Sequence, residues 1–230
     1  MSHDIAIAAG ETPRETLASP RRRTAGTALV ASGIVFFLAE FIAASAWTDP
    51  PYSYTYHFIS DLGVHGPSTA FDQYMYSPLA WVMNTGFVTF GVAALVGVLL
   101  LKGLRGARRW TLTAMAVLLA AGGVLVGLFP GSGEAIENGT ATYHGLGAFG
   151  LFIGGNVLAI LLGRRHQALG LSPGTGRICV VLGALGLVSL VAFGGILAAG
   201  ISVLIGFFER GAVYLFLAAF ITAGSALRRR

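Results

Sequence analysis

Apolar runs of about twenty residues recur along the whole chain, and this feature constrains the fold more than any other. A run of that length crosses the hydrocarbon core of a bilayer as a single helix. Only 11% of the residues are charged, whereas soluble domains carry about 25%. The sequence therefore predicts an all-α fold, a polytopic membrane helix bundle.

Six transmembrane helices are expected within a single domain, residues 24–230, which follows a disordered cytoplasmic tail over residues 1–23. Apolar residues run almost unbroken from Ile178 to Phe208, so the last two helices are separated by either a kink or a buried turn at Gly194-Gly195 and Gly200. The predicted spans are Gly26–Trp47, Leu79–Leu101, Trp110–Phe129, Tyr143–Leu162, Ile178–Leu197 and Ile205–Leu227.

Basic residues set the predicted orientation. With both termini in the cytoplasm, every one of the 15 basic residues except Arg210 falls on the cytoplasmic side, as the positive-inside rule requires. The basic pI of about 9.8 then reflects contact with anionic lipid heads and not a nucleic-acid surface. We expect a multi-pass protein of a bacterial plasma (inner) membrane, with membrane lipids as partners. Whether it forms a homo-oligomer is left open.

The outer side gathers most of the titratable residues. The loop between the first two spans is about 30 residues long, and loops of that length usually carry function. It contains the segment YHFISDLGVHGP, Tyr56 to Pro67. If Tyr54 to Leu62 is helical, His57 and Asp61 lie on one face, because they are four residues apart.

A histidine and an aspartate on one face are half of a metal site. Zinc needs three or four N, O or S ligands, and His144, at the outer end of the fourth span, is the natural third ligand. Glu134 or Glu137, just before it, would act as general base on a metal-bound water. The predicted cofactor is therefore a divalent metal such as zinc.

Other interpretations of these residues stay open. Ser60 is a candidate nucleophile with His57 as its base. Asp61 would alternatively cap a helix or pair with Arg210. Glu209-Arg210 is either an acidic helix start with an interfacial arginine, or a clamp for a phosphate or carboxylate. The loop as a whole would otherwise be purely structural.

Three polar residues lie within the spans. Glu40 should face the bundle interior or an aqueous cavity, because an ionised group at mid-bilayer costs roughly 2.5–3.5 kcal/mol. Asn84 and Asn156 are interpreted as hydrogen-bonding contacts between helices.

The ordered motifs resemble a known family. YHFISDLGVHGP follows the first span, NTGFVTFG lies in the second, GLFPGS ends the third, HGLGAFG opens the fourth and FFERG precedes the last. This set is similar to the bacterial and archaeal membrane family called domain of unknown function 998, from the first helix to the end of the chain. The resemblance implies a fold and a topology but no chemistry.

The ISDLG…P element also resembles a segment of the eukaryotic Frag/DRAM/Sfk membrane proteins, a group with a factor in lumenal remodelling of lipid anchors. That analogy implies a lipid-handling site containing Ser60, Asp61, Gly63 and Pro67.

The leading hypothesis is an outward-facing polar pocket that binds a lipid or other amphiphile, or processes it by metal-assisted hydrolysis or transfer. The alternative is a small transporter or non-catalytic lipid-binding partner protein, with a path past Glu40, Asn84 and Asn156. Haem ligation by His57 and His144 is disfavoured, because both lie near the surface. The predicted pocket residues are His57, Ser60, Asp61, Glu134, His144, Glu209 and Arg210.

Overall fold

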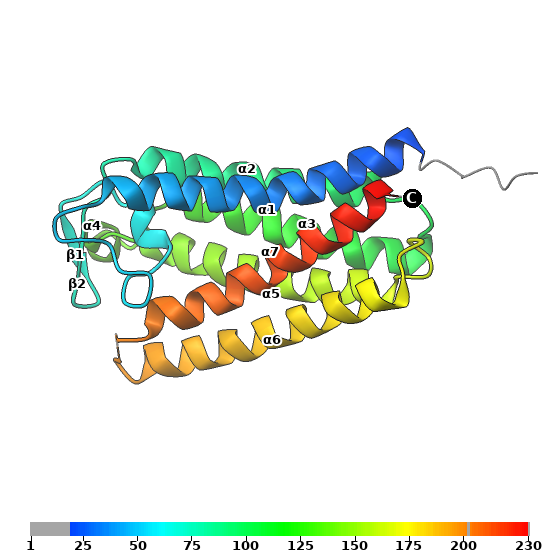
Figure 1. Ribbon diagram of the computed structural model, residues 1–230. Coiled ribbons are helices and arrows are strands. Elements are labelled where there is room, and N and C mark those ends of the chain that lie inside the picture. Colours follow the sequence, from blue (N-terminus) through cyan, green and yellow to red (C-terminus); the bar gives the residue numbers. More distant parts are fainter. Residues whose placement is uncertain (1–18, 202, 230) are drawn as a thin grey trace, which may run out of the picture.

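Six long helices form the body of the molecule. The computed structural model describes residues 19–201 and 203–229 and shows these helices side by side (Figure 1). Each is long and apolar enough to cross a membrane, which confirms the predicted fold class. The six helices are α1 (Pro20–Ala46), α2 (Ala80–Leu100), α3 (Gly106–Leu128), α5 (Ala141–Arg164), α6 (Pro173–Ala198) and α7 (Ile205–Arg229).

Neighbouring helices pack in a closed ring. The order around the ring is α1, α2, α3, α5, α6, α7 and back to α1, and α5 also contacts α7 directly. The α5–α7 contact leaves α6 at the periphery, with 17% of its most apolar segment buried against 56% for α7. α6 therefore faces mostly outward, whereas α7 is the most buried of the six helices.

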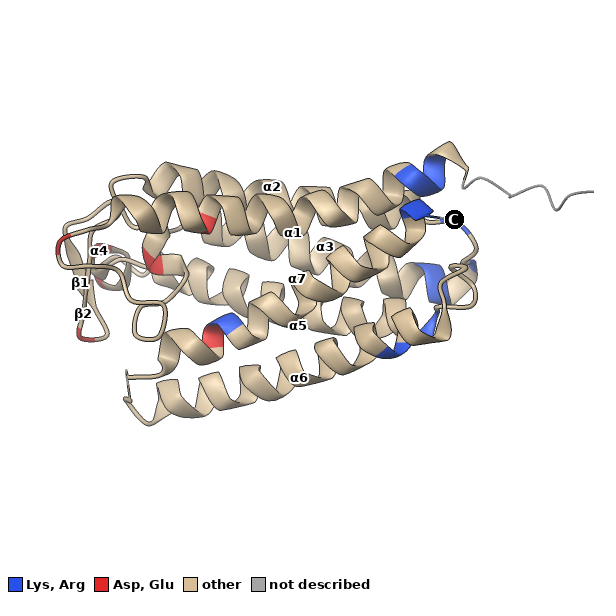
Figure 2. Ribbon diagram, in the orientation of Figure 1, with Lys and Arg blue, Asp and Glu red and all other residues tan. Residues whose placement is uncertain are grey.

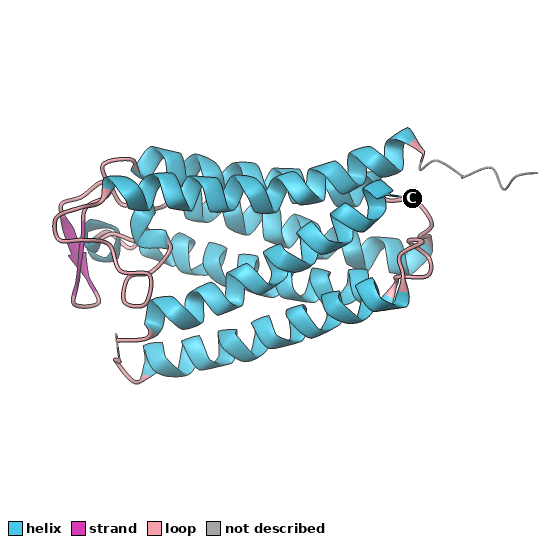
Figure 3. Cartoon of the chain, viewed as in Figure 1, coloured by secondary structure: helices cyan, strands magenta, loops and turns pink. Residues whose placement is uncertain are grey.

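The connections at one end carry extra structure, and we call this the loop end. Residues 47–79, between α1 and α2, contain the 3-10 helix η1 (Ser60–Gly63) and an antiparallel hairpin of β1 (Ser68–Ala70) and β2 (Gln73–Met75). The short helix α4 (Gly133–Glu137) contacts β1. Figure 3 shows strands only in this part of the described chain.

The opposite end is rich in arginine, and we call it the basic end. Figure 2 shows the Lys and Arg residues of the described chain gathered there, except for one arginine on α7 near the loop end. The acidic residues lie in the other half, on or near the loop end. The separation is the one that the positive-inside rule uses to orient a membrane protein.

Several helix ends differ from those predicted by up to six residues, and two details at the helix ends change the interpretation. α1 begins at Pro20, because Ser19 caps the helix by accepting the amide N–H of Arg22 and proline is favoured in the first turn. Residues 20–23 are therefore helical, and residues 1–18 of the predicted tail lie outside the described residues. α6 and α7 are separate helices, and the turn between them is exposed at Gly200, with φ of +67°, rather than buried.

Glycine permits the close contact between the first and last helices. A Cβ atom at Gly26 of α1 would collide with the carbonyl oxygen of Gly224 on α7, and one at Gly224 would collide with that of Gly26. Small residues at such positions let membrane helices approach until their backbones touch. This contact holds α1 against α7 near the basic end.

Candidate functional site

Arg210 lies in the second turn of α7 and pairs with Glu40 of α1. Its Nε donates to Glu40 Oε1 at 3.1 Å, and Nη2 lies 3.1 Å from the same oxygen. The Tyr214 hydroxyl donates to the two carboxylate oxygens at 2.7 and 2.8 Å. Glu40 is 1% exposed, so it faces the bundle interior as predicted. The charges of Arg210 and Glu40 neutralise each other, so Arg210 is not available to bind a substrate phosphate.

The same guanidinium group holds the long loop. Arg210 Nη1 donates to the carbonyl oxygens of Tyr54 at 2.7 Å and His57 at 3.0 Å. Nη2 donates to the Tyr52 hydroxyl, and the guanidinium carbon lies 4.8 Å from the centre of the Tyr54 ring. Because these carbonyls bind Arg210, the helix considered over Tyr54 to Leu62 is not formed, and only η1 is present.

His57 has a structural environment. Its Nδ1 accepts the amide N–H of Ser53 at 3.0 Å, and its ring stacks on Tyr52 with 5.3 Å between the ring centres. Burial, followed by the charge of Arg210, lowers the pKa of His57. No hydrogen bond joins His57 to Ser60 among the described residues, so the proposed nucleophile and base are not paired.

A cavity of about 150 Å³ lies at the loop end, and we call it the loop-end cavity. It is bounded by α5, α6, the first turns of α7, and the loops around η1 and α4. Its titratable residues are Asp61, His144 and Glu209, all three of which the sequence predicted as pocket residues. Its apolar lining is dominated by phenylalanine: Phe58, Phe71, Phe149, Phe152 and Phe193.

Two buried carboxyl groups lie at the inner side of this cavity. Asp61 Oδ2 accepts the amide N–H of Phe58 at 3.0 Å, and Glu209 Oε2 accepts that of Ile59 at 2.5 Å. The two side chains are 4% and 5% exposed. Burial, and then the negative charge of Glu209, raise the pKa of Asp61 well above its usual range.

His144 stands at the start of α5 with one ring nitrogen engaged. Its Nδ1 lies 2.8 Å from the carbonyl oxygen of Phe129. A carbonyl can only accept, so Nδ1 carries the proton and Nε2 presents a lone pair beside Gly131, another cavity residue. His144 is thus oriented to accept a hydrogen bond from a ligand.

The other predicted residues lie outside the cavity. Ser60 lines a separate void of about 20 Å³, which shares Glu209 with the cavity. Glu134 is exposed and accepts the Ser68 hydroxyl at 2.9 Å, which joins α4 to the hairpin. Hydrogen bonds from its own backbone, Ser132 and Ser68 lower its pKa. Glu134 therefore stabilises the contact between α4 and the hairpin, and Glu137 lies on the surface. Neither residue lines the cavity.

The predicted zinc site is not formed. Asp61 and His144 line the cavity, but His57 binds Ser53 instead of facing them. Throughout residues 19–201 and 203–229, no group of three or more His, Cys, Asp or Glu side chains is arranged to hold a metal ion. The metal prediction assumed that the four-residue spacing of His57 and Asp61 places them on one helical face. In the structure, the loop carbonyls of Tyr54 and His57 bind Arg210, and that helix is not present.

The alternative transport path is packed in this conformation. Asn156 is fully buried and donates to the carbonyl oxygens of Phe152 at 2.9 Å and Ala212 at 2.8 Å. Asn84 donates to the Gly63 carbonyl at 2.9 Å, so it holds η1 on α2. Asn156 thus makes the interhelical contact expected of it, whereas Asn84 binds η1 of the loop instead of another spanning helix.

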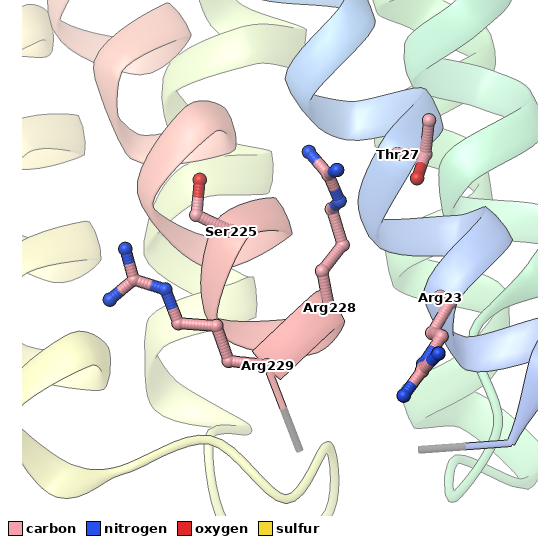
Figure 4. Close-up of a pocket in the computed structure, with 5 residues that line it drawn as sticks. All are labelled: Arg23, Thr27, Ser225, Arg228 and Arg229. Carbon is pink, nitrogen blue, oxygen red and sulfur yellow. The ribbon is translucent and has the colours of Figure 1, made fainter. Parts of the chain in front are cut away.

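A larger cavity lies elsewhere, at the basic end. It is an open depression of about 580 Å³ between the first turns of α1 and the last turns of α7. Figure 4 shows its arginines and two hydroxyl side chains: Arg23, Thr27, Ser225, Arg228 and Arg229. All three arginines are exposed, as expected of residues that meet anionic lipid heads at a membrane surface.

The sequence did not reveal the aromatic residues around Arg210 or those that line the loop-end cavity. In sequence, Tyr52 and Tyr54 look like the tyrosines that many membrane proteins place at the bilayer interface, and the cavity phenylalanines resemble any apolar residue of a span. One signal was available: Glu40 and Arg210 are charges of opposite sign in the outer part of two spans, and such charges usually pair.

Comparison with known proteins gives a family. No curated protein and no solved structure matches the chain. Residues 29–226 match the family described as Protein of unknown function (DUF998), and this range contains α2, α3, α5 and α6 entirely and most of α1 and α7. The chain is a member of the DUF998 family.

Proposed function

We propose that the protein binds the polar end of a membrane amphiphile in the loop-end cavity. The observation that carries this proposal is the composition of the cavity wall, which combines five phenylalanines with Asp61, His144 and Glu209. Ligand sites are typically apolar pockets with a few convergent polar groups, and an amphiphile matches both kinds of lining.

The rim of the cavity supports access from the membrane. Phe71, Ile136 and Phe149 line the cavity, yet they are 61%, 47% and 46% exposed. An apolar chain lying against them would continue from the cavity along the outside of the bundle. Exposed apolar residues next to a cavity mark a place where another apolar surface binds.

The packing of α5 against α6 supports the same route. Near the basic end the two helices touch, because a Cβ at Gly163 would collide with the carbonyl oxygen of Gly176. In Figure 1 the two helices diverge toward the loop end. There Phe152 of α5 and Phe193 of α6 lie with 5.7 Å between their ring centres, and both line the cavity. The diverging parts of α5 and α6 therefore form part of the cavity wall.

The size of the cavity limits what enters it. A volume of about 150 Å³ equals that of an engineered protein cavity that admits one benzene molecule. It therefore accommodates a head group or the end of a chain, and the rest of the amphiphile lies outside. Binding is proposed rather than hydrolysis, since neither Ser60 with His57 nor a metal site is assembled in the described residues.

A photoactivatable lipid tests this proposal. Protein in nanodiscs that contain a diazirine-bearing lipid is irradiated, and the labelled peptides are mapped by mass spectrometry. We expect labels concentrated on the cavity-lining parts of α5 and α6. Gly145→Leu should abolish them, because Gly145 lines the cavity and its Cβ direction is open.

Gly195→Leu is the matched control. Gly195 also has open space around its Cβ direction, lies on α6 at the same end of the bundle, and does not line the cavity. Labelling of the cavity peptides should be unchanged in this variant. Labels spread evenly over all outward-facing helices, or equal labelling in the two variants, would overturn the proposal.

A further inference from the structure

We propose that the amphiphile carries an ammonium head group, held between the carboxyl groups of Asp61 and Glu209 and the phenylalanine rings of the loop-end cavity. This inference rests on the proposed function and adds the chemical class of the ligand. Three independent features carry it: the free carboxyl oxygens, the absence of a cation in the described lining, and the arrangement of the rings.

The two carboxyl groups are oriented by consecutive backbone amides. Asp61 Oδ2 binds the N–H of Phe58, and Glu209 Oε2 binds the N–H of Ile59. The second oxygen of each group accepts no hydrogen bond from the described residues, although both side chains are at least 95% buried and line the cavity. Two acceptor oxygens without a donor, on residues that are almost entirely buried, favour a ligand that donates hydrogen bonds or carries positive charge.

The described lining of the cavity contains no lysine or arginine. Arg210 follows Glu209 in sequence, but its guanidinium is bound by Glu40, by Tyr52 and by the loop carbonyls. An anionic head group would therefore meet carboxyl groups and no counter-charge. A cationic head group would stabilise the ionised form of these carboxyl groups, whose buried negative charge is costly when it is left unpaired.

The phenylalanine rings form one continuous chain around the cavity. Ring centres are separated by 6.0 Å for Phe71 and Phe58, 6.0 Å for Phe58 and Phe193, 5.7 Å for Phe193 and Phe152, and 6.5 Å for Phe152 and Phe149. All four pairs are edge-to-face. Ring faces attract ammonium ions, and aromatic cages recognise quaternary ammonium ligands in this way. The same faces disfavour phosphate and carboxylate.

The test compares head groups on one tail. Dodecyltrimethylammonium, dodecanoate and dodecyl maltoside are added, below the concentration that dissolves nanodiscs, as competitors of the photoactivatable lipid. We expect the ammonium compound to reduce cavity labelling at about tenfold lower concentration, or less, than the other two. The advantage should disappear in Asp61→Asn/Glu209→Gln but persist in Glu134→Gln, a control acid outside the cavity at the same end.

The outcomes separate the two proposals. Equal competition by the three compounds would overturn the ammonium inference and leave amphiphile binding in place. No competition by any of them would overturn the proposed function. Tetramethylammonium, which has no tail, should compete poorly. If it competes as well as dodecyltrimethylammonium, the ligand is a soluble amine, and the proposal that the ligand is an amphiphile is overturned. The head-group comparison uses the unmodified protein, so it stands even if the double variant does not fold.

Discussion

Arg210 of α7 and Glu40 of α1 form a buried ion pair, with 3.1 Å between Nη2 and Oε1. The residues are separated by 170 positions in the chain, and the same guanidinium binds the carbonyl oxygens of Tyr54 and His57. One side chain therefore joins the first helix, the last helix and the loop that covers the loop-end cavity. Since Glu209 precedes Arg210, this pair also positions a carboxyl group of the cavity.

Removing Glu40 should strongly destabilise the protein. Glu40→Ala leaves the buried charge of Arg210 without its partner, and breaking a buried pair in this way costs about 3–5 kcal/mol. Cys179 is the single cysteine of the chain and is fully buried, so a thiol-reactive fluorophore reports unfolding on heating. We expect a lower Tm for Glu40→Ala, with partial recovery in Glu40→Leu/Arg210→Met. A Tm equal to that of the unmodified protein would contradict the structural role of the pair.

The six helices could be predicted because span length and hydrophobicity are local properties of the sequence. No spacing rule predicted the Glu40–Arg210 contact, because the two positions are far apart, and only their opposite charges pointed to it. The sequence placed Glu40 in the bundle interior or an aqueous cavity from the energy of burying a charge. For Arg210 it offered Asp61 or a ligand phosphate or carboxylate as partners, and the structure pairs Arg210 with Glu40 instead.

The site was predicted in part for the same reason. Asp61, His144 and Glu209 do line one cavity, because several helices meet at the loop end. His57 does not, because its carbonyl is bound by Arg210 and its ring packs against Tyr52. Hydrophobic pattern alone cannot distinguish a phenylalanine that lines a cavity from one that faces lipid, so the aromatic part of the site was missed.

The contact between α1 and α7 should depend on glycine. Gly224→Ala places a methyl group against the backbone of Gly26 and Val30, so we expect a lower Tm in the Cys179 labelling assay. Gly194→Ala is the control, because a Cβ there meets nothing within 4 Å. Alanine is favoured over glycine in a helix by about 1 kcal/mol, so Gly194→Ala should leave Tm unchanged or raise it slightly. A lower Tm for Gly194→Ala alone would reverse this interpretation.

Metal chelation should leave the protein unaffected. The described residues offer no group of three metal-ligating side chains, so we expect no stabilisation by a bound ion. We expect the same Tm with and without EDTA, and no stoichiometric zinc in elemental analysis of the purified protein. Zinc that is retained by the unmodified protein but lost in both Asp61→Ala and His144→Ala would restore the metal hypothesis.

The orientation in the membrane can be tested with single cysteines. In a Cys179→Ala background, His65→Cys places an exposed thiol at the loop end and Lys102→Cys places one at the basic end. The positive-inside rule predicts that a membrane-impermeant maleimide labels position 65 in intact cells and position 102 only after permeabilisation. The reverse pattern would place the loop-end cavity in the cytoplasm.

The stability difference between Asp61→Asn and the unmodified protein should depend on pH. Burial and the charge of Glu209 raise the pKa of Asp61, so the folded state favours its protonated form. The contribution of protonated Asp61 to the free energy of unfolding is fully present below the pKa of an unfolded aspartate, about 3.9. It is lost as pH rises through the pKa of Asp61 in the folded state.

Asparagine stays neutral and keeps an oxygen that can accept the amide N–H of Phe58, so the Tm of Asp61→Asn relative to the unmodified protein should rise from about pH 4 toward neutral pH. Other charged groups near Asp61, including Glu209, Arg210, Glu40 and His144, are present in both proteins, so their effects on the difference in Tm largely cancel.

Glu134→Gln provides a control of opposite sign. The pKa of Glu134 is lowered, so its contribution is present above the pKa of an unfolded glutamate and is lost as pH falls. Parallel pH profiles for Asp61→Asn and the unmodified protein would show that Asp61 is not held in a desolvated carboxyl pair.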